Sequence, residues 1–92
     1  MHETGIVRDL VRRVEQAGRE AGARRVARIE VWLGALSQFS PAHFREHFDD
    51  EARGTLAEGA TLGIESSSDL RDPNAQSVLI RSLDLEVPEQ EA

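Results

Sequence analysis

Residues 24–34 read RRVARIEVWLG, and this stretch decides the fold. Its side chains alternate, with Ala27, Ile29, Val31 and Leu33 on one side and Arg28, Glu30 and Trp32 on the other. This period of two predicts a strand with one buried face, which Gly34 ends. Trp32 falls on the charged face. We interpret it as a ring packed over arginine side chains, in preference to an anchor for a partner protein.

The segment before this strand predicts a helix. Apolar residues recur at spacings of three and four from Glu3 to about Ala21, which is the pattern of an amphipathic helix. Gly22 is placed to cap its end. Such a helix buries one stripe and can cover the apolar face of the strand.

A second helix is predicted after the strand, where residues 39–44 read FSPAHF. Ser40 suits the N-cap and Pro41 the first helical position, and Phe39 can pack on Phe44 as a hydrophobic staple. We expect this helix to run to about Arg53. Its apolar stripe is narrow, and its far end is acidic.

Two further strands complete the pattern. Residues 61–66 form a short alternating segment, residues 66–77 are rich in loop formers, and residues 77–87 read SVLIRSLDLEV. In the last strand we expect Leu79, Leu83, Leu85 and Val87 to share one face, which Arg81 interrupts. The order predicts an α+β fold, with two helices packed on one face of a three-stranded sheet and a single domain over residues 1–92.

Composition restricts the class of protein. The chain has 92 residues, a formal net charge of −6 and no cysteine. The negative charge argues against nucleic acid or an anionic membrane as the main partner, and the lack of cysteine excludes thiolate metal sites. Neither a secretory signal nor a membrane span is apparent, so we expect a cytoplasmic protein.

Residues 43–47, HFREH, fit a zinc-peptidase pattern in which His43 and His47 bind metal and Glu46 acts as a base. The chain is short, and no third ligand is evident on a neighbouring helix. We therefore favour a solvated helix face over a weak accessory metal site, and either of these over catalysis. A nucleophile elbow and a phosphate-binding loop are also absent, so we predict that the protein is not an enzyme.

Several motifs, in this order, resemble the HypA/HybF family of nickel metallochaperones. They are Met1-His2-Glu3, Leu33-Gly34-Ala35-Leu36-Ser37, Ser40-Pro41 and the segment GTLAEGA at residues 54–60. The resemblance covers roughly residues 1–66. It implies a HypA-like nickel-binding domain that delivers Ni(II) during maturation of nickel-iron hydrogenase and, in some organisms, urease. It also implies two partners, a HypB-type GTPase and the hydrogenase large subunit.

The same resemblance implies that nickel is held by Met1, His2 and Glu3, through the terminal amine, the imidazole of His2 and the backbone nitrogens of His2 and Glu3. The chemistry is sound, because adjacent chelate rings pull nitrogen donors into a plane that suits Ni(II) or Cu(II) better than zinc. Binding should strengthen as pH rises, since each donor must lose its proton.

Family members carry a zinc domain of two cysteine-pair knuckles before the last strand. Here DPNAQS at residues 72–77 stands in place of a Cys-Pro-x-Cys-x-Ser knuckle, with Asp72 and Ala75 at the cysteine positions. We expect a short loop over residues 66–77 instead of that domain, and no zinc. The alternative function is a degenerate interaction module without metal transfer. The long last strand allows a monomer or a strand-exchanged dimer.

Overall fold

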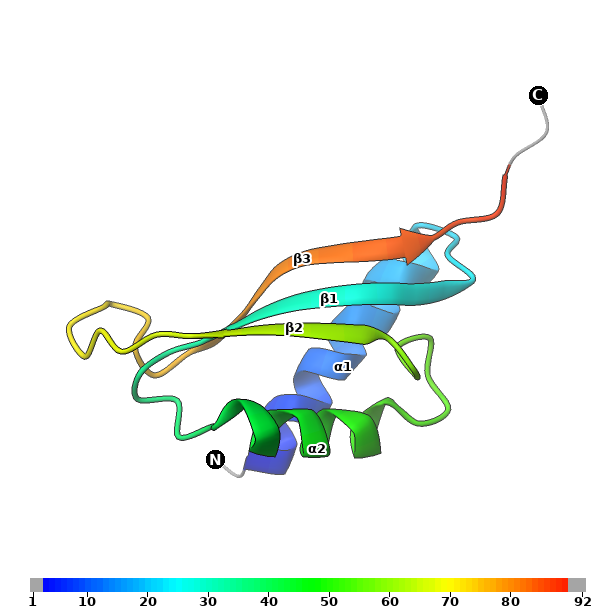
Figure 1. The fold of residues 1–92 in the computed structure, drawn as a ribbon. Coiled ribbons are helices and arrows are strands. Elements are labelled where there is room, and N and C mark those ends of the chain that lie inside the picture. Colours follow the sequence, from blue (N-terminus) through cyan, green and yellow to red (C-terminus); the bar gives the residue numbers. More distant parts are fainter. Residues whose placement is uncertain (1–2, 90–92) are drawn as a thin grey trace.

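The computed structural model describes residues 3–89. Its elements follow in the order α1 (Glu3–Glu20), β1 (Arg25–Leu33), α2 (Pro41–Ala52), β2 (Thr61–Ser66) and β3 (Val78–Glu86). The sheet order is β2-β1-β3, with β1 parallel to β2 and antiparallel to β3. Both helices pack on one face of this sheet (Figure 1). The predicted fold class is confirmed.

The helices end close to the residues that the local sequence predicts. Beyond the end of α1, Gly22 adopts a φ of 70°, a left-handed conformation that glycine takes without steric cost. At the start of α2, the backbone N–H of His43 donates to the Ser40 hydroxyl at 3.1 Å. The rings of Phe39 and Phe44 meet edge to face, with centroids 5.4 Å apart. The predicted N-cap and hydrophobic staple are therefore confirmed.

The core lies between β1 and the two helices. Its most completely buried large side chains come from all three elements: Val7 and Val14 of α1, Phe44 and Phe48 of α2, and Val26, Ile29, Val31 and Leu33 of β1. No strand of the described sheet other than β1 supplies a side chain to this group. The central strand and the helices thus hold the interior, and the edge strands β2 and β3 flank it.

The predicted alternation of β1 is wrong at its first apolar position. Val26 is fully buried, whereas Ala27 is half-buried. The pairing with β3 moves from Val26 opposite Leu85 to Arg28 opposite Asp84, which leaves Ala27 as an extra residue. Such a bulge reverses the faces on one side of it. Ile29 and the residues beyond it keep the predicted orientation.

A second bulge corrects the prediction for β3. The pairing moves from Glu30 opposite Ser82 to Val31 opposite Ile80, so Arg81 is the extra residue. The side chains packed against the core are Val78, Ile80, Leu83 and Leu85. Leu79 therefore lies on the opposite face, where it pairs with Trp32, and Val87 is exposed. The face predicted to hold Leu79 together with Leu83 and Leu85 is therefore wrong at Leu79, and Val87 lies beyond the end of β3.

Trp32 lies on the face of the sheet that carries no helix, yet only 5% of it is exposed. The guanidinium carbon of Arg81 lies 5.5 Å from the centre of its ring, within the range of a cation–π contact. The interpretation of Trp32 as a ring packed against arginine is confirmed. Burial leaves little of this side chain for a partner.

The connection between β2 and β3 is tied to the turn that follows β1. The Gly34 N–H donates to the Ser77 carbonyl at 2.9 Å, and the Leu36 N–H donates to the Ala75 carbonyl at 2.7 Å. A Cβ atom at Gly34 would lie 2.2 Å from the Ala75 carbonyl oxygen. Glycine is therefore required here for the close approach of two backbones.

Candidate metal centre

The predicted nickel ligands lie at the start of the chain. Met1 and His2 fall outside the described residues, and Glu3 begins α1. The first N–H groups of a helix have no intrahelical acceptor, so the Glu3 amide nitrogen is not committed to the helix. This backbone can therefore supply a nitrogen donor without breaking a helical hydrogen bond.

Arg8 ties the first half of α1 to the end of α2. Its guanidinium forms two hydrogen bonds of 3.3 Å with the Glu51 carboxylate, from Nε and from an Nη atom. The hydrogen bond and the charge of Glu51 raise the pKa of Arg8 above its ordinary value. In Figure 1 the first turns of α1 lie against α2. The start of α1 is thus held beside a second helix.

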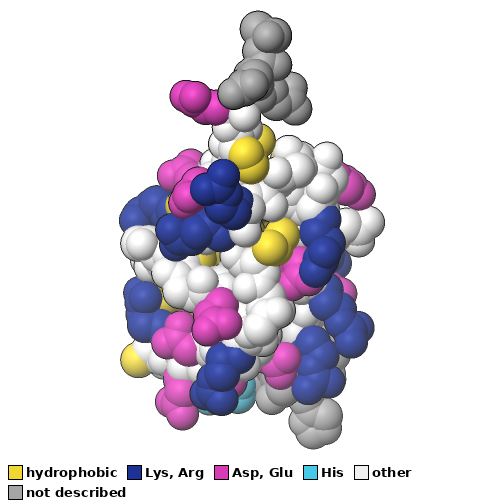
Figure 2. Space-filling view, turned by 90° about the vertical axis from the view of Figure 1, so that its right-hand side faces the viewer, with side chains coloured by type: hydrophobic (Ala, Val, Ile, Leu, Met, Phe, Trp, Pro, Cys, Tyr) yellow, Lys and Arg dark blue, Asp and Glu magenta, His cyan; other side chains and the backbone are white. Residues whose placement is uncertain are grey.

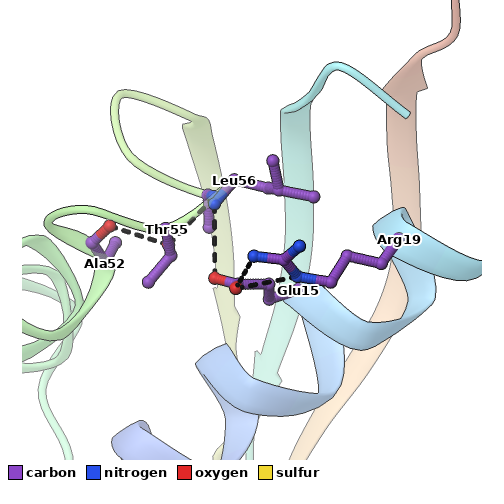
Figure 3. Close-up of polar contacts among 6 residues, drawn as sticks. Glu15, Arg19, Ala52, Thr55 and Leu56 are labelled. Carbon is purple, nitrogen blue, oxygen red and sulfur yellow. Dashed lines mark hydrogen bonds and ion pairs between the residues drawn. The ribbon is translucent and has the colours of Figure 1, made fainter. Parts of the chain in front are cut away.

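Glu15 makes a further connection, between α1 and the segment that leads from α2 to β2. Its carboxylate accepts from the Leu56 N–H at 3.4 Å and pairs with Arg19 at 2.9 Å (Figure 3). Next to it, the Thr55 hydroxyl donates to the Ala52 carbonyl at 2.7 Å. Each of these polar groups has a hydrogen-bond or ion-pair partner. We therefore infer that they stabilise the packing of α1 against this segment.

Two acidic residues at the end of α2 form ion pairs with arginines of the same chain. Asp50 pairs with Arg53 at 2.6 Å, and Glu51 pairs with Arg8. On the face shown in Figure 2, arginine and acidic side chains are interspersed over the described residues. Mixed charge of this kind gives no broad basic surface on that face.

No helix within residues 3–89 is long and apolar enough to cross a membrane.

The two histidines of α2 meet side by side. Their Nε2 atoms are 3.0 Å apart, and their ring centroids are 4.6 Å apart. Both side chains are half-buried, while Glu46 between them in sequence is exposed. Across residues 3–89, no group of three or more His, Cys, Asp or Glu side chains is placed to hold a metal ion. The described residues therefore do not complete the peptidase pattern.

Sequence reasoning missed the long-range polar contacts. Arg8 and Glu51 are 43 positions apart, and Glu15 and Leu56 are 41 apart. Neither pair has a local signal, because helical periodicity predicts partners three or four residues away. Asp50 and Arg53, at that spacing, are the kind of pair that the pattern can predict.

Residues 1–70 match a family model described as "Hydrogenase/urease nickel incorporation, metallochaperone, hypA". Among curated relatives, the hydrogenase maturation factor HypA of Chlorobium limicola is 43% identical over 65 residues, which are 71% of this chain and 56% of that protein. HypA of Methylocella silvestris is 42% identical over 65 residues, or 71% and 58% of the two chains. The chain thus spans little more than half the length of these relatives.

Two solved structures share the fold. The solution structure of the Ni metallochaperone HypA from Helicobacter pylori matches with a TM-score of 0.78 and 17% identity, over 96% of this chain and all of that one. A second solution structure of a HypA protein matches with a TM-score of 0.62 and 22% identity, over 92% of each chain. The matched family is one of metallochaperones, in agreement with the prediction that the protein is not an enzyme.

Proposed function

This chain belongs to the HypA family, and from that membership we propose that it binds Ni(II) and delivers it during maturation of nickel-iron hydrogenase. The ligands in this proposal are Met1, His2 and Glu3, and nickel is the cargo. The observation that carries it is the family match, which extends from residue 1 and includes this tripeptide.

The start of α1 supports the chemistry. The terminal amine, the His2 imidazole and the backbone nitrogens of His2 and Glu3 form adjacent chelate rings, which favour the planar coordination of Ni(II). Glu3 lies in the first helical turn, where an amide nitrogen has no intrahelical acceptor. The pairing of Arg8 with Glu51 joins the next turn of α1 to the end of α2.

We further propose that the connection at residues 66–77 takes the place of the family's zinc domain in a single domain over residues 1–92, and that no zinc is bound there. Asp72 and Ala75 offer no thiolate, and the backbone N–H groups of Gly34 and Leu36 donate to the carbonyls of Ser77 and Ala75. Its shortness and its attachment to the β1 turn suit a structural connection better than a metal knuckle.

The proposed partners are a HypB-type GTPase, which loads nickel, and the hydrogenase large subunit, which receives it. Urease is a second recipient that the description of the matched family includes. The cytoplasmic location and the choice between monomer and strand-exchanged dimer stay predictions from the sequence. In the structure β3 pairs with β1 of its own chain.

The test is a Ni(II) titration of the chain with a free Met1 amine, followed by the visible absorption of planar nickel. The chain contains no lysine, so an amine-reactive reagent acetylates the Met1 amine selectively. We expect the planar-nickel absorption to saturate with one ion at the terminal site, and to be lost after acetylation and in His2→Gln. Mass spectrometry verifies Met1 in each sample, and His47→Gln serves as a histidine control that keeps the signal.

Equal signals in the free and the acetylated chain would contradict the proposed ligand set. No signal in any sample would favour the alternative, an interaction module that has kept the fold and lost metal transfer. Binding to the GTPase or to the large subunit, measured without nickel, would then be the property to pursue.

A further inference from the structure

His43 and His47 are arranged as a chelating pair. The two residues are one helical turn apart on α2, and their side chains converge until the Nε2 atoms are 3.0 Å apart. Hydrogen bonding between the rings requires one Nε2 to donate and the other to accept. The same convergence places two imidazole nitrogens where a single metal ion can meet both.

The spacing fits a particular coordination geometry. Imidazole nitrogens lie about 2.0–2.1 Å from a bound divalent transition metal. Two such nitrogens at a right angle are about 2.8–3.0 Å apart, and at the tetrahedral angle about 3.3–3.4 Å apart. The observed 3.0 Å agrees with adjacent positions of a square-planar or octahedral ion. The pair can therefore chelate such an ion with little change in its separation.

Neighbouring contacts hold the pair in place. The Phe39 ring lies 6.1 Å from the His43 ring and 6.5 Å from the His47 ring, measured between centroids. The Ser40 hydroxyl caps the turn that carries His43, and the buried Phe44 and Phe48 fix the opposite side of α2 to the core. A metal ion would therefore meet donors whose backbone is already ordered.

We propose that His43 and His47 form a metal site, in addition to the proposed ligand set of Met1, His2 and Glu3, for one late first-row divalent ion such as Ni(II) or Cu(II). The two Nε2 atoms supply adjacent ligands to this ion. The exposed Glu46 is not a ligand in this proposal. Two imidazole donors alone make a weaker chelate than the four nitrogen donors proposed at the start of the chain.

The experiment first removes two ligands of the proposed terminal site. In His2→Gln protein with an acetylated Met1 amine, His43 and His47 are the remaining histidines of the chain. Ni(II) is titrated into this protein by calorimetry. We expect one ion per chain, with affinity lowered at least about tenfold by His47→Gln and by His43→Gln, and changed less than about threefold by Glu46→Gln.

Trp32 fluorescence and far-UV circular dichroism verify that each variant is folded before titration. The parent showing no saturable binding would overturn the proposal, as would an unchanged affinity in both histidine variants. A large loss in Glu46→Gln would replace it with a three-ligand site. Because the His2 imidazole and the free Met1 amine are absent throughout, these outcomes are independent of the nickel titration that tests the proposed function.

Discussion

Residues 3–66 and residues 67–89 contribute to one sheet in different ways. The first region holds the helices, β1 and β2, and nearly every fully buried side chain, whereas the second adds β3 with half-buried side chains and only Ala75 buried. The relatives match the first region, and the second lies largely beyond the match. The first region thus supplies the interior, while the second is held mainly by backbone pairing to β1 and to Gly34.

The largest expected effect comes from the interior of the first region. Phe44 is fully buried and packs edge to face with Phe39. We expect Phe44→Ala to lower the free energy of unfolding by about 3–5 kcal/mol, because it leaves a cavity between α2 and the sheet. Urea denaturation followed by circular dichroism measures the loss.

The matched control is Leu70→Ala in the second region, where the leucine is 65% exposed. Its effect should stay within about 0.5 kcal/mol. If both substitutions cost the same, the assignment of the core to the first region would be wrong.

The next effect concerns the joint between the two regions. A Cβ atom added at Gly34 would meet the Ala75 carbonyl oxygen at 2.2 Å, and one added at Gly63 would meet the Glu30 carboxylate at the same distance. The carbonyl belongs to the backbone and cannot move alone, whereas the Glu30 side chain can rotate away. We expect Gly34→Ala to cost about 2–4 kcal/mol and Gly63→Ala less than about 1 kcal/mol.

Equilibrium denaturation of the two variants gives these values, and hydrogen exchange shows where Gly34→Ala acts. Faster exchange at the Gly34 and Leu36 amides, which bond to the second region, would identify the loosened joint. A Gly63→Ala variant as unstable as Gly34→Ala would mean that the sheet surface, not the joint, resists added volume.

A smaller effect is expected within β3. Leu83 lies opposite Ile29 in the sheet, but Leu83 is half-buried while Ile29 is fully buried. Leu83→Ala should cost about 1–2 kcal/mol, less than the 2–5 kcal/mol typical of a fully buried aliphatic side chain. Urea denaturation of Leu83→Ala and Ile29→Ala measures the pair. Equal losses would show that β3 belongs to the core as fully as β1.

The sequence predicts the helices and strands from local patterns, but it does not predict how the strands pair. The helix from Glu3, the Ser40 cap and the strand around Ile29 follow from local periodicity and capping, and the structure confirms them. The bulges at Ala27 and Arg81 could not be predicted, because an extra residue in one strand depends on its pairing partner and changes no local pattern. Hence the face of Leu79 was predicted wrongly.

The candidate site shows the same limit. The Met1-His2-Glu3 tripeptide was recognisable as a motif, and it stays a prediction because Met1 and His2 lie outside the described residues. The spacing of His43 and His47 predicted that their imidazoles could approach each other. The 3.0 Å separation of their Nε2 atoms depends on the side-chain conformations, which the sequence does not specify.

The smallest effect tests the surface contact that joins the two regions on the helix-free face. Arg81 of β3 covers Trp32 of β1 with its guanidinium carbon 5.5 Å from the ring centre. Arg81→Gln keeps a long side chain but removes the charge, so we expect a loss of about 0.5–1 kcal/mol. Trp32 emission should shift to longer wavelength and acrylamide should quench it more strongly, since the ring gains contact with water. Arg71→Gln, which removes an arginine from the exposed connection, should leave the emission unchanged. If Arg81→Gln also leaves the emission unchanged, Trp32 is buried by the sheet and the connection alone, and β3 contributes to that face through its backbone.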